Sequence, residues 1–323
     1  MRLRLWISIA GTVLLTAACG GTLSLPPQIV QFLYVSNPGA NLISVFTATA
    51  TGNTAPIRTI SGAATGLSFP LGLILDNAGN LYVANSNGNS ITVYTLGASG
   101  NSAPIRTISG ASTGLSAPSG LALDVSGNLY ASNSFGNTIT VYAAGATGNV
   151  PPIRTIGGAA TGLVGPEGLG LDSAGNLYVS NFNIPTPGSI TVYASGVTGN
   201  VAPIRTISGA ATGLDNDPGG LTLDGAGNLY VALDGNSSVA VFAPGATGNV
   251  APIRAITGIA TGISGPRGVA LDSAGNLYAA NFNTGFEHVT VYAAGANGNA
   301  APIRTIGGAA TGLDNPYGVA LGR

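Results

Sequence analysis

Four polar side chains that could take part in binding or catalysis stand beside prolines that recur along the chain. Glu167, Arg267 and Tyr317 each follow the proline of a P-x-G segment, and Asp217 precedes another such proline. A carboxylate can accept hydrogen bonds, act as a general base or bind a metal ion, and a guanidinium binds carboxylates through paired hydrogen bonds. The remaining P-x-G segments carry uncharged residues at this position: Leu71, Ser119 and Gly219.

Three phenylalanines form a second set of residues that differ between copies of the repeat. Phe135, Phe182 and Phe282 lie between two apolar runs, in segments where other copies carry small or polar residues. Exposed aromatic rings are typical of recognition surfaces. We predict that these phenylalanines form one ligand-binding surface with Glu167, Arg267, Tyr317 and Asp217. Free drift of surface loops is the alternative, although the equally exposed GATGNVAPIR loops are nearly uniform.

The rest of the sequence offers little catalytic or metal-binding chemistry. His288 is the single histidine, and neither a nucleophile nor an orienting group can be assigned to it, as a Ser/His/Asp site would require. The repeated D-x-x-G-N segments each bring one carboxylate, whereas a calcium site needs several oxygen ligands. We therefore predict turn-capping roles for these aspartates: Asp76, Asp124, Asp172, Asp224 and Asp272. No catalytic residue, metal or cofactor is predicted.

An internal repeat supplies the elements that must position these residues. The arginine of the PIRTI-like segment recurs at 58, 106, 154, 205, 254 and 304, a period near fifty. One period holds four short runs rich in Val, Ile, Leu, Tyr and Thr, separated by Gly, Asn, Asp or Pro, as expected for strands and turns. Such a period is typical of propeller blades. We expect the repeat arginines to pair with the repeat aspartates or with carbonyl groups between blades.

The two ends of the repeat region predict how the ring closes. The chain enters a repeat at the Leu-Tyr strand near Phe32 and stops after Val319–Leu321, which is the strand that the first repeat lacks. Pairing these ends gives an all-β, six-bladed β-propeller of four-stranded antiparallel blades, and the closed ring leaves few open edges. In that fold the variable P-x-G loops and the variable turns share one face.

A family resemblance rests on the pattern P-x-G-[LV]-x-L-D-x-x-G-N-L-Y-[VA]. The segment 266–281, followed by a T-V-Y strand, resembles an NHL repeat, and the resemblance covers roughly residues 31–323. It implies a six-bladed propeller, a fold that serves in protein docking, RNA binding, lyases and lactonases. Lactonase-like propellers use a central Glu, Asn and Asp, of which Glu167 and the asparagines that follow the Leu-Tyr strands supply part. Lyase-like propellers use His and Glu with a divalent metal, and histidine is scarce here.

The N-terminal segment has the features of a secretory signal. Arg2 and Arg4 precede an apolar run, and small residues lead to Cys19, the single cysteine. The segment Leu15–Gly20 resembles the lipobox of bacterial lipoproteins, with Thr16 where leucine is usual. We predict a signal peptide over 1–18, lipidation at Cys19, a tether over 19–31 and the propeller over 32–323. Ordinary cleavage near the same place is the alternative.

Charge and localisation narrow the choice of function. Without Arg2 and Arg4 the chain has 8 arginines and 11 acidic residues, a net charge of −3, so no basic face for nucleic acid is expected. We predict a monomeric lipoprotein of the bacterial cell envelope, on the periplasmic or surface side, that contacts membrane only through its anchor and binds a protein, peptide or glycan without catalysis. A metal-dependent lactonase- or streptogramin-lyase-like enzyme and a structural surface protein of little affinity are the alternatives.

Overall fold

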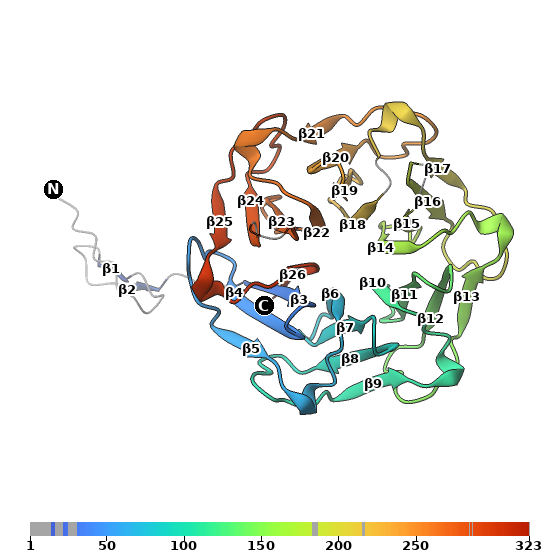
Figure 1. Cartoon of the computed structure of the whole chain (residues 1–323), viewed down its shortest axis with the longest axis horizontal. Coiled ribbons are helices and arrows are strands. Elements are labelled where there is room, and N and C mark those ends of the chain that lie inside the picture. The colour runs from blue at the N-terminus through green and yellow to red at the C-terminus, as the bar shows by residue number, and fades with distance from the viewer. Residues whose placement is uncertain are drawn as a thin grey trace.

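The computed structural model is a closed ring of six four-stranded antiparallel sheets about a common axis (Figure 1). Residues of all six inner strands line a central channel along this axis. It describes residues 14–16, 22–24, 31–182, 187–214, 217–283, 285 and 287–322. A separate two-stranded sheet pairs β1 (Leu14–Thr16) with β2 (Thr22–Ser24). Within the described ranges, no helix has the length and apolarity needed to cross a membrane. Cys19 lies outside the described residues.

Each blade runs from an inner strand at the channel to a short outer strand at the circumference. Blade 1 consists of β26 (Val319–Gly322), β3 (Phe32–Asn37), β4 (Leu42–Thr47) and β5 (Arg58–Ile60). Blade 2 consists of β6 (Pro70–Leu75), β7 (Leu81–Asn85), β8 (Ser90–Tyr94) and β9 (Arg106–Ser109). Blade 3 consists of β10 (Pro118–Leu123), β11 (Leu129–Asn133), β12 (Thr138–Tyr142) and β13 (Arg154–Gly157).

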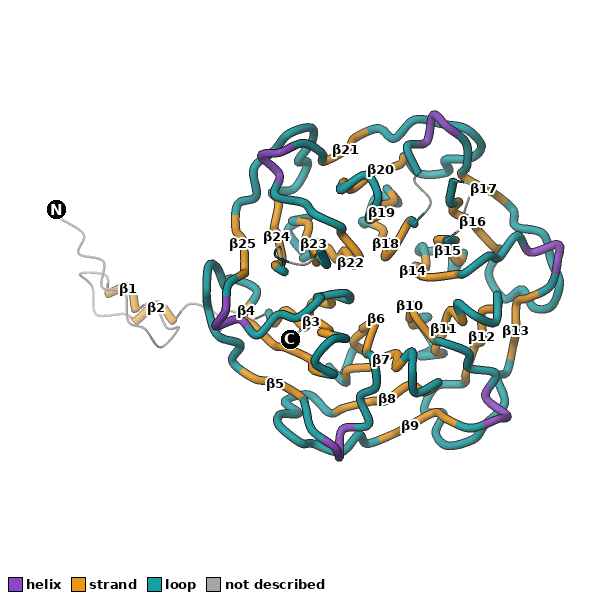
Figure 2. Tube along the Cα trace, in the orientation of Figure 1, coloured by secondary structure: helices purple, strands orange, loops and turns teal. Residues whose placement is uncertain are grey.

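The other three blades repeat this order. Blade 4 consists of β14 (Pro166–Leu171), β15 (Leu177–Asn181), β16 (Ser189–Tyr193) and β17 (Arg205–Ile207). Blade 5 consists of β18 (Pro218–Leu223), β19 (Leu229–Leu233), β20 (Ser238–Phe242) and β21 (Arg254–Ile256). Blade 6 consists of β22 (Pro266–Leu271), β23 (Leu277–Asn281), β24 (His288–Tyr292) and β25 (Arg304–Gly307). A 3-10 turn follows each outer strand at the circumference (Figure 2): 63–65, 111–113, 159–161, 210–212, 259–261 and 309–311.

The ring closes through strands from both ends of the repeat region. In blade 1, β26 pairs with β3 in a register that runs from Val319 opposite Val35 to Gly322 opposite Phe32. A second closure lies at the circumference, where Gly52 forms a parallel bridge with Ile306 of blade 6. The predicted all-β fold, its six four-stranded blades and the pairing of the terminal strands are therefore confirmed.

The hydrophobic core lies between the blades. Each of six buried clusters joins side chains from two neighbouring blades; one packs Tyr178 and Ile190 of blade 4 against Leu229 and Phe242 of blade 5. Every residue of the second strand in each of blades 2 to 6 is buried. These strands are packed on both faces, which explains why apolar and polar residues do not alternate along them.

The repeat arginines have partners that the sequence analysis did not predict. In blades 2 to 6 the arginine at the start of the outer strand donates a hydrogen bond to the tyrosine of the second strand, as Arg106 does to Tyr82 at 2.6 Å. Its guanidinium also lies over the tyrosine ring. The expected bonds to carbonyl groups occur only at Arg254 and Arg304 among the described residues. Strand register brings Arg106, Val93 and Tyr82 into one row, so the phenol lies nearer than any aspartate.

The repeat aspartates have the predicted turn-capping role. Asp76 Oδ1 accepts hydrogen bonds from the backbone N–H groups of Ala78 and Asn80, and Oδ2 accepts one from the Asn80 side chain. The same three bonds recur at Asp124, Asp172, Asp224 and Asp272. Because these carboxylates are committed to their own turns, they hold the blades in shape.

A buried asparagine ends the second strand in five blades. In blade 3, Asn133 Nδ2 donates to Thr140 Oγ1 at 3.1 Å, and Oδ1 accepts from the N–H of Ser116 at 3.0 Å. Blade 5 replaces both partners together, with Leu233 and Ala240 at the equivalent positions. The asparagines are therefore structural, and they are not available to form a lactonase-like site.

That paired replacement predicts the result of a double-mutant cycle. Asn133→Leu should lower the free energy of unfolding by about 2 to 3 kcal/mol, because it leaves Thr140 and the Ser116 N–H without their buried partner. Adding Thr140→Ala should restore about 1 kcal/mol, since both members of the pair are then apolar as in blade 5. Urea unfolding of the two single variants and the double variant measures the coupling; strict additivity would contradict this account.

Candidate functional site

The residue after each inner-strand proline lies at one mouth of the central channel. A pocket of about 70 Å³ at this mouth is lined by Ser119, Glu167, Arg267 and Tyr317, together with glycines and apolar residues of the inner strands. It is smaller than the cavity of about 150 Å³ that admits benzene. The pocket therefore has room for a few water molecules or for one small polar group. We call this side of the ring, with the P-x-G loops and the turns after the second strands, the variable face.

Glycines at the third position of the P-x-G segments allow the inner strands to approach one another. A Cβ atom on Gly120 would lie 2.1 Å from the backbone carbonyl oxygen of Glu167, and one on Gly268 would lie 2.2 Å from that of Tyr317. Neither distance leaves room for a methyl group. The close approach sets the width of the channel and brings the side chains of Glu167, Arg267 and Tyr317 to one place.

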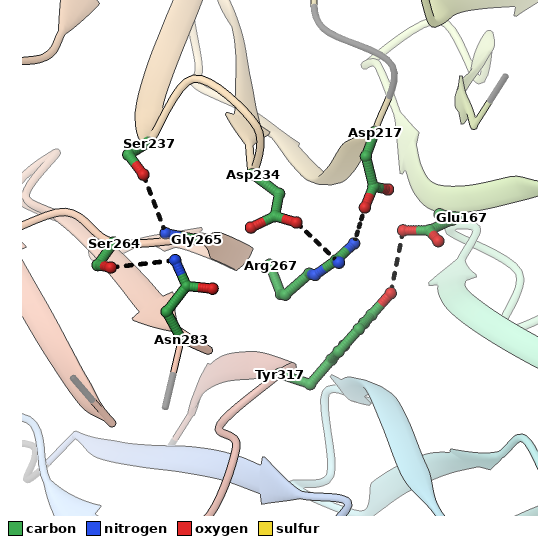
Figure 3. A network of polar contacts seen from close by, with 9 residues as sticks. All are labelled: Glu167, Asp217, Asp234, Ser237, Ser264, Gly265, Arg267, Asn283 and Tyr317. Atoms are coloured by element: carbon green, nitrogen blue, oxygen red, sulfur yellow. Dashed lines mark hydrogen bonds and ion pairs between the residues drawn. The ribbon is translucent and has the colours of Figure 1, made fainter. Parts of the chain in front are cut away.

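Arg267 of blade 6 is held by two carboxylates of blade 5 (Figure 3). Its Nη1 pairs with Asp217 Oδ2, and its Nη2 pairs with Asp234 Oδ2 at 2.9 Å. The three side chains are only 17%, 17% and 22% exposed. Burial alone would lower the pKa of Arg267, but its neighbours, with Tyr317 and Asp217 first among them, raise that pKa above its usual range. The guanidinium therefore stays charged.

Two aromatic rings enclose the same guanidinium. Its central carbon lies 5.5 Å from the centre of the Phe282 ring and 5.9 Å from that of Tyr317, distances at which cation–π attraction acts. The two rings meet edge to face at 6.4 Å. The loop that carries Arg267 is tied to the neighbouring turns, because Gly265 N–H donates to Ser237 Oγ and accepts at its carbonyl the N–H of Phe282. The guanidinium is therefore fixed in place.

Glu167 and Tyr317 connect opposite blades across the channel mouth. The Tyr317 hydroxyl donates to Glu167 Oε2 at 3.0 Å, and these residues belong to blades 1 and 4 (Figure 3). Burial, followed by repulsion from Asp217, raises the pKa of Glu167 to about 7. Burial, followed by the nearby Glu167 carboxylate, raises the pKa of Tyr317 well above its ordinary value. Tyr317 therefore remains a hydrogen-bond donor throughout the range in which Glu167 titrates.

Five of the predicted ligand-binding residues lie together: Glu167, Arg267, Tyr317, Asp217 and Phe282. Two lie on the same face outside this cluster. Phe135 projects into solvent with 86% of its surface exposed, and Phe182 packs at Gly165, whose carbonyl accepts its N–H. Asp234 completes the cluster and was absent from the predicted set. Its place in the turn after the second strand, where blades 1 to 4 have no acid, is the sequence signal that could have identified it.

The cluster does not resemble a metal centre. Across the described residues, no group of three or more His, Cys, Asp or Glu side chains could hold a metal ion. Asp217 and Asp234 pair with Arg267, a cation that already fills the position between them. His288 lies elsewhere on the variable face, with Nε2 2.8 Å from the carbonyl oxygen of Gly262. The residues present fit a polar and aromatic binding surface better than a divalent ion.

The raised pKa of Glu167 predicts a pH-dependent stability. The folded protein holds the Glu167 proton more tightly than the unfolded chain, so this stabilisation is complete below pH 4.5 and is lost as the pH rises through 7. Relative to Glu167→Gln, which keeps a hydrogen-bonding side chain without titration, the wild type should lose about 2 to 3 kcal/mol between pH 4.5 and pH 8. Urea unfolding at both pH values tests this; a constant difference between the two proteins would contradict it.

Comparison with known proteins defines the class of fold. No family model matches the sequence, and no curated protein matches it. The structure is similar to a chain in the crystal structure of a nidogen/laminin complex, at 20% identity and a TM-score of 0.65, over 90% of this chain and 98% of that one. It is also similar to a putative 6-phosphogluconolactonase from Bacteroides uniformis, at 17% identity and a TM-score of 0.58, over 96% and 94% of the two chains.

A third similar structure is the WD40 β-propeller domain of Doa1, at 15% identity and a TM-score of 0.54, over 85% of this chain and 84% of that one. At these identities the likeness shows the fold alone. The protein is a six-bladed β-propeller, and the function must be argued from its own residues.

Proposed function

We propose that this protein is an NHL-repeat propeller, anchored by a lipid at Cys19 in the bacterial cell envelope, which binds a protein, peptide or glycan at its variable face without catalysis. The NHL-like pattern over 32–323 and the signal-like segment before Cys19 support the class and the location. The tether over 19–31 joins the anchor to the ring, and the propeller acts as a monomer.

One observation carries the proposal of a binding role. The side chains that differ between copies of the repeat gather at one channel mouth, where Arg267, two carboxylates and two aromatic rings are fixed within hydrogen-bond or ring-contact distance. The aspartates that recur in blades 2 to 6 and the arginines that recur in all six blades instead complete turns and blades. A preformed cluster of aromatic, acidic and guanidinium groups is what a recognition site requires, since such groups fix orientation without reorganisation.

Binding arrays test this proposal with defined probes. The mature chain with Cys19→Ser, which removes the expected lipidation, is applied to arrays of synthetic peptides and of purified glycans. We expect reproducible binding to one class of ligand, either peptides or glycans. The double variant Phe135→Ser, Glu167→Gln should bind that ligand at least tenfold more weakly. Asp124→Asn, on the opposite face, keeps a turn-capping oxygen and serves as the matched control. Binding that is unchanged in the double variant but lost in Asp124→Asn would place the binding site outside the variable face.

One observation favours an enzyme as the second candidate. A carboxylic acid whose pKa is near 7, next to a phenol at a channel mouth, has the properties of a general acid or base. A metal-dependent lactonase- or lyase-like propeller would bind a divalent ion tightly. Thermal unfolding after chelation, with single divalent ions added back, tests it: an ion-specific rise in Tm that disappears in Glu167→Ala supports the enzyme, and an unchanged Tm argues against it.

A further inference from the structure

Charge is divided unequally between the two faces of the ring. Strand direction places five acidic residues on the variable face. Glu167, Asp217 and Asp314 lie at or before the start of an inner strand, Glu287 precedes a third strand, and Asp234 follows a second strand. Arg267 is the one arginine there among the described residues. Among the described residues, five carboxyl groups and one guanidinium give this face a formal charge of −4 when all of them are ionised. The acidic excess of the chain therefore lies beside the candidate site.

The opposite face is nearly neutral. We call it the uniform face, because the same D-x-x-G-N turn follows the inner strand in blades 2 to 6. Its five aspartates cap those turns, and the six repeat arginines begin the outer strands close to them, so the formal charge is +1. Mixed charge at short range cancels within about a Debye length, whereas a single-sign face steers an oppositely charged partner.

The surroundings of Arg267 show what this mouth offers to a basic side chain. A guanidinium is held there between two carboxylates and against two aromatic rings. These are the contacts by which proteins bind arginine and lysine side chains of a partner. Arg267 and its two aspartates together carry a formal charge of −1, and Glu167 adds to it when ionised.

The pocket contains a carboxylate oxygen that can accept a hydrogen bond from a cationic side chain, and its volume fits such a group. Among the hydrogen bonds between described residues, the Tyr317 hydroxyl donates to Glu167 Oε2, and none involves Glu167 Oε1. The pocket volume of about 70 Å³ can take an ammonium or guanidinium head but is too small for a sugar ring. On the same face, Phe135 and Phe69 are 86% and 38% exposed, so the variable face also presents apolar surface. Apolar rings around a charged centre suit a polypeptide better than a small polyamine.

We propose that the variable face docks a basic polypeptide segment, with one arginine or lysine side chain of that partner entering the channel mouth at Glu167 and with apolar residues of the partner covering Phe135 and Phe69. This inference rests on the proposed function and names the partner class of the same site. Charge complementarity between a −4 face and a cationic segment accelerates association and weakens with salt.

The place where the chain enters the ring agrees with such a partner. Phe32, the first residue of β3, pairs with Thr47 and Gly322, at the end of blade 1 that belongs to the uniform face. A tether from Cys19 would therefore join the ring on the side of the uniform face and not on the variable face.

Three nonapeptide libraries test the proposal by fluorescence anisotropy at 20 and 200 mM NaCl. They share five random positions and carry arginine, glutamine or glutamate at the other four. We expect the mature chain with Cys19→Ser to bind the arginine library at least tenfold more tightly than the glutamine library, and more weakly at high salt. Glu167→Gln with Asp314→Asn should cost at least tenfold while leaving the Arg267 ion pairs in place. Asp124→Asn on the uniform face should change the affinity less than twofold.

The outcomes separate this inference from the proposed function. Equal binding of the arginine and glutamine libraries, or binding to glycans alone, overturns the basic partner and leaves the proposed binding role standing. Tight binding that Asp124→Asn weakens as much as the variable-face variant also overturns it. If neither a peptide nor a glycan binds, the inference is wrong, and the proposed function is restricted to folded protein partners. Unchanged circular dichroism and Tm in the variants ensure that lost binding is not lost folding.

Discussion

Replacing Arg267 by leucine should destabilise the protein far more than replacing an arginine of the repeat set. The variant leaves Asp217 and Asp234 without their cation, and removing one partner of a largely buried ion pair costs about 3 to 5 kcal/mol. Because these side chains are still 17% to 22% exposed, we expect Arg267→Leu to lower the free energy of unfolding by about 3 kcal/mol at pH 8. Leucine already occupies the equivalent position in blade 2, as Leu71, so the backbone tolerates it.

Arg106→Leu is the matched control for this experiment. It removes a hydrogen bond to a neutral phenol and a ring contact, which together are worth about 1 to 2 kcal/mol. A further variant adds Asp217→Asn and Asp234→Asn to Arg267→Leu, and should recover stability because no carboxylate is left unpaired. Urea unfolding at pH 8 measures all three. If Arg267→Leu costs no more than Arg106→Leu, the ion pairs do not hold the channel mouth together.

Gly120→Ala is expected to have the second large effect. The new methyl group would lie 2.1 Å from the carbonyl oxygen of Glu167, a backbone atom of the next blade. Relief requires two inner strands to move apart, and overpacking against flexible side chains already costs about 1 to 3 kcal/mol, so we expect more than about 3 kcal/mol. The variant should lower Tm strongly or fail to give folded protein.

Gly225→Ala provides the control, because a Cβ atom there meets nothing within 4 Å and other blades carry Asn77 or Val125 at the same place. It should leave Tm within a few degrees of the wild type. A Gly120→Ala protein as stable as Gly225→Ala would mean that the channel is wider than the structure has it.

The period of the sequence was sufficient to predict the blades. Four β-prone runs per period, bounded by turn residues, define strands locally, and the incomplete first and last repeats predict the pairing that β3 and β26 make. Register across a blade was harder to predict. The row of Arg106, Val93 and Tyr82 depends on how three strands align, so the tyrosine partners of the arginines were not predicted, whereas the expected carbonyl bonds occur at Arg254 and Arg304.

The candidate site could be predicted as a face but not as a set of contacts. Variation between copies identified Glu167, Arg267 and Tyr317, because residues that serve the blade must recur while these do not. The bond between Glu167 and Tyr317 joins residues 150 positions apart in opposite blades, and only the closed ring brings them together. Asp234 pairs with Arg267 across a blade boundary for the same reason.

Amide hydrogen exchange with and without the tightest array ligand tests most directly whether function lies on the variable face. The account predicts slower exchange in the loops that enter the inner strands, around Glu167, Arg267 and Tyr317, and in the turn that carries Phe135. The uniform-face turns 76–80 and 124–128 should exchange at unchanged rates. Protection confined to those turns, or spread equally over both faces, would contradict the account.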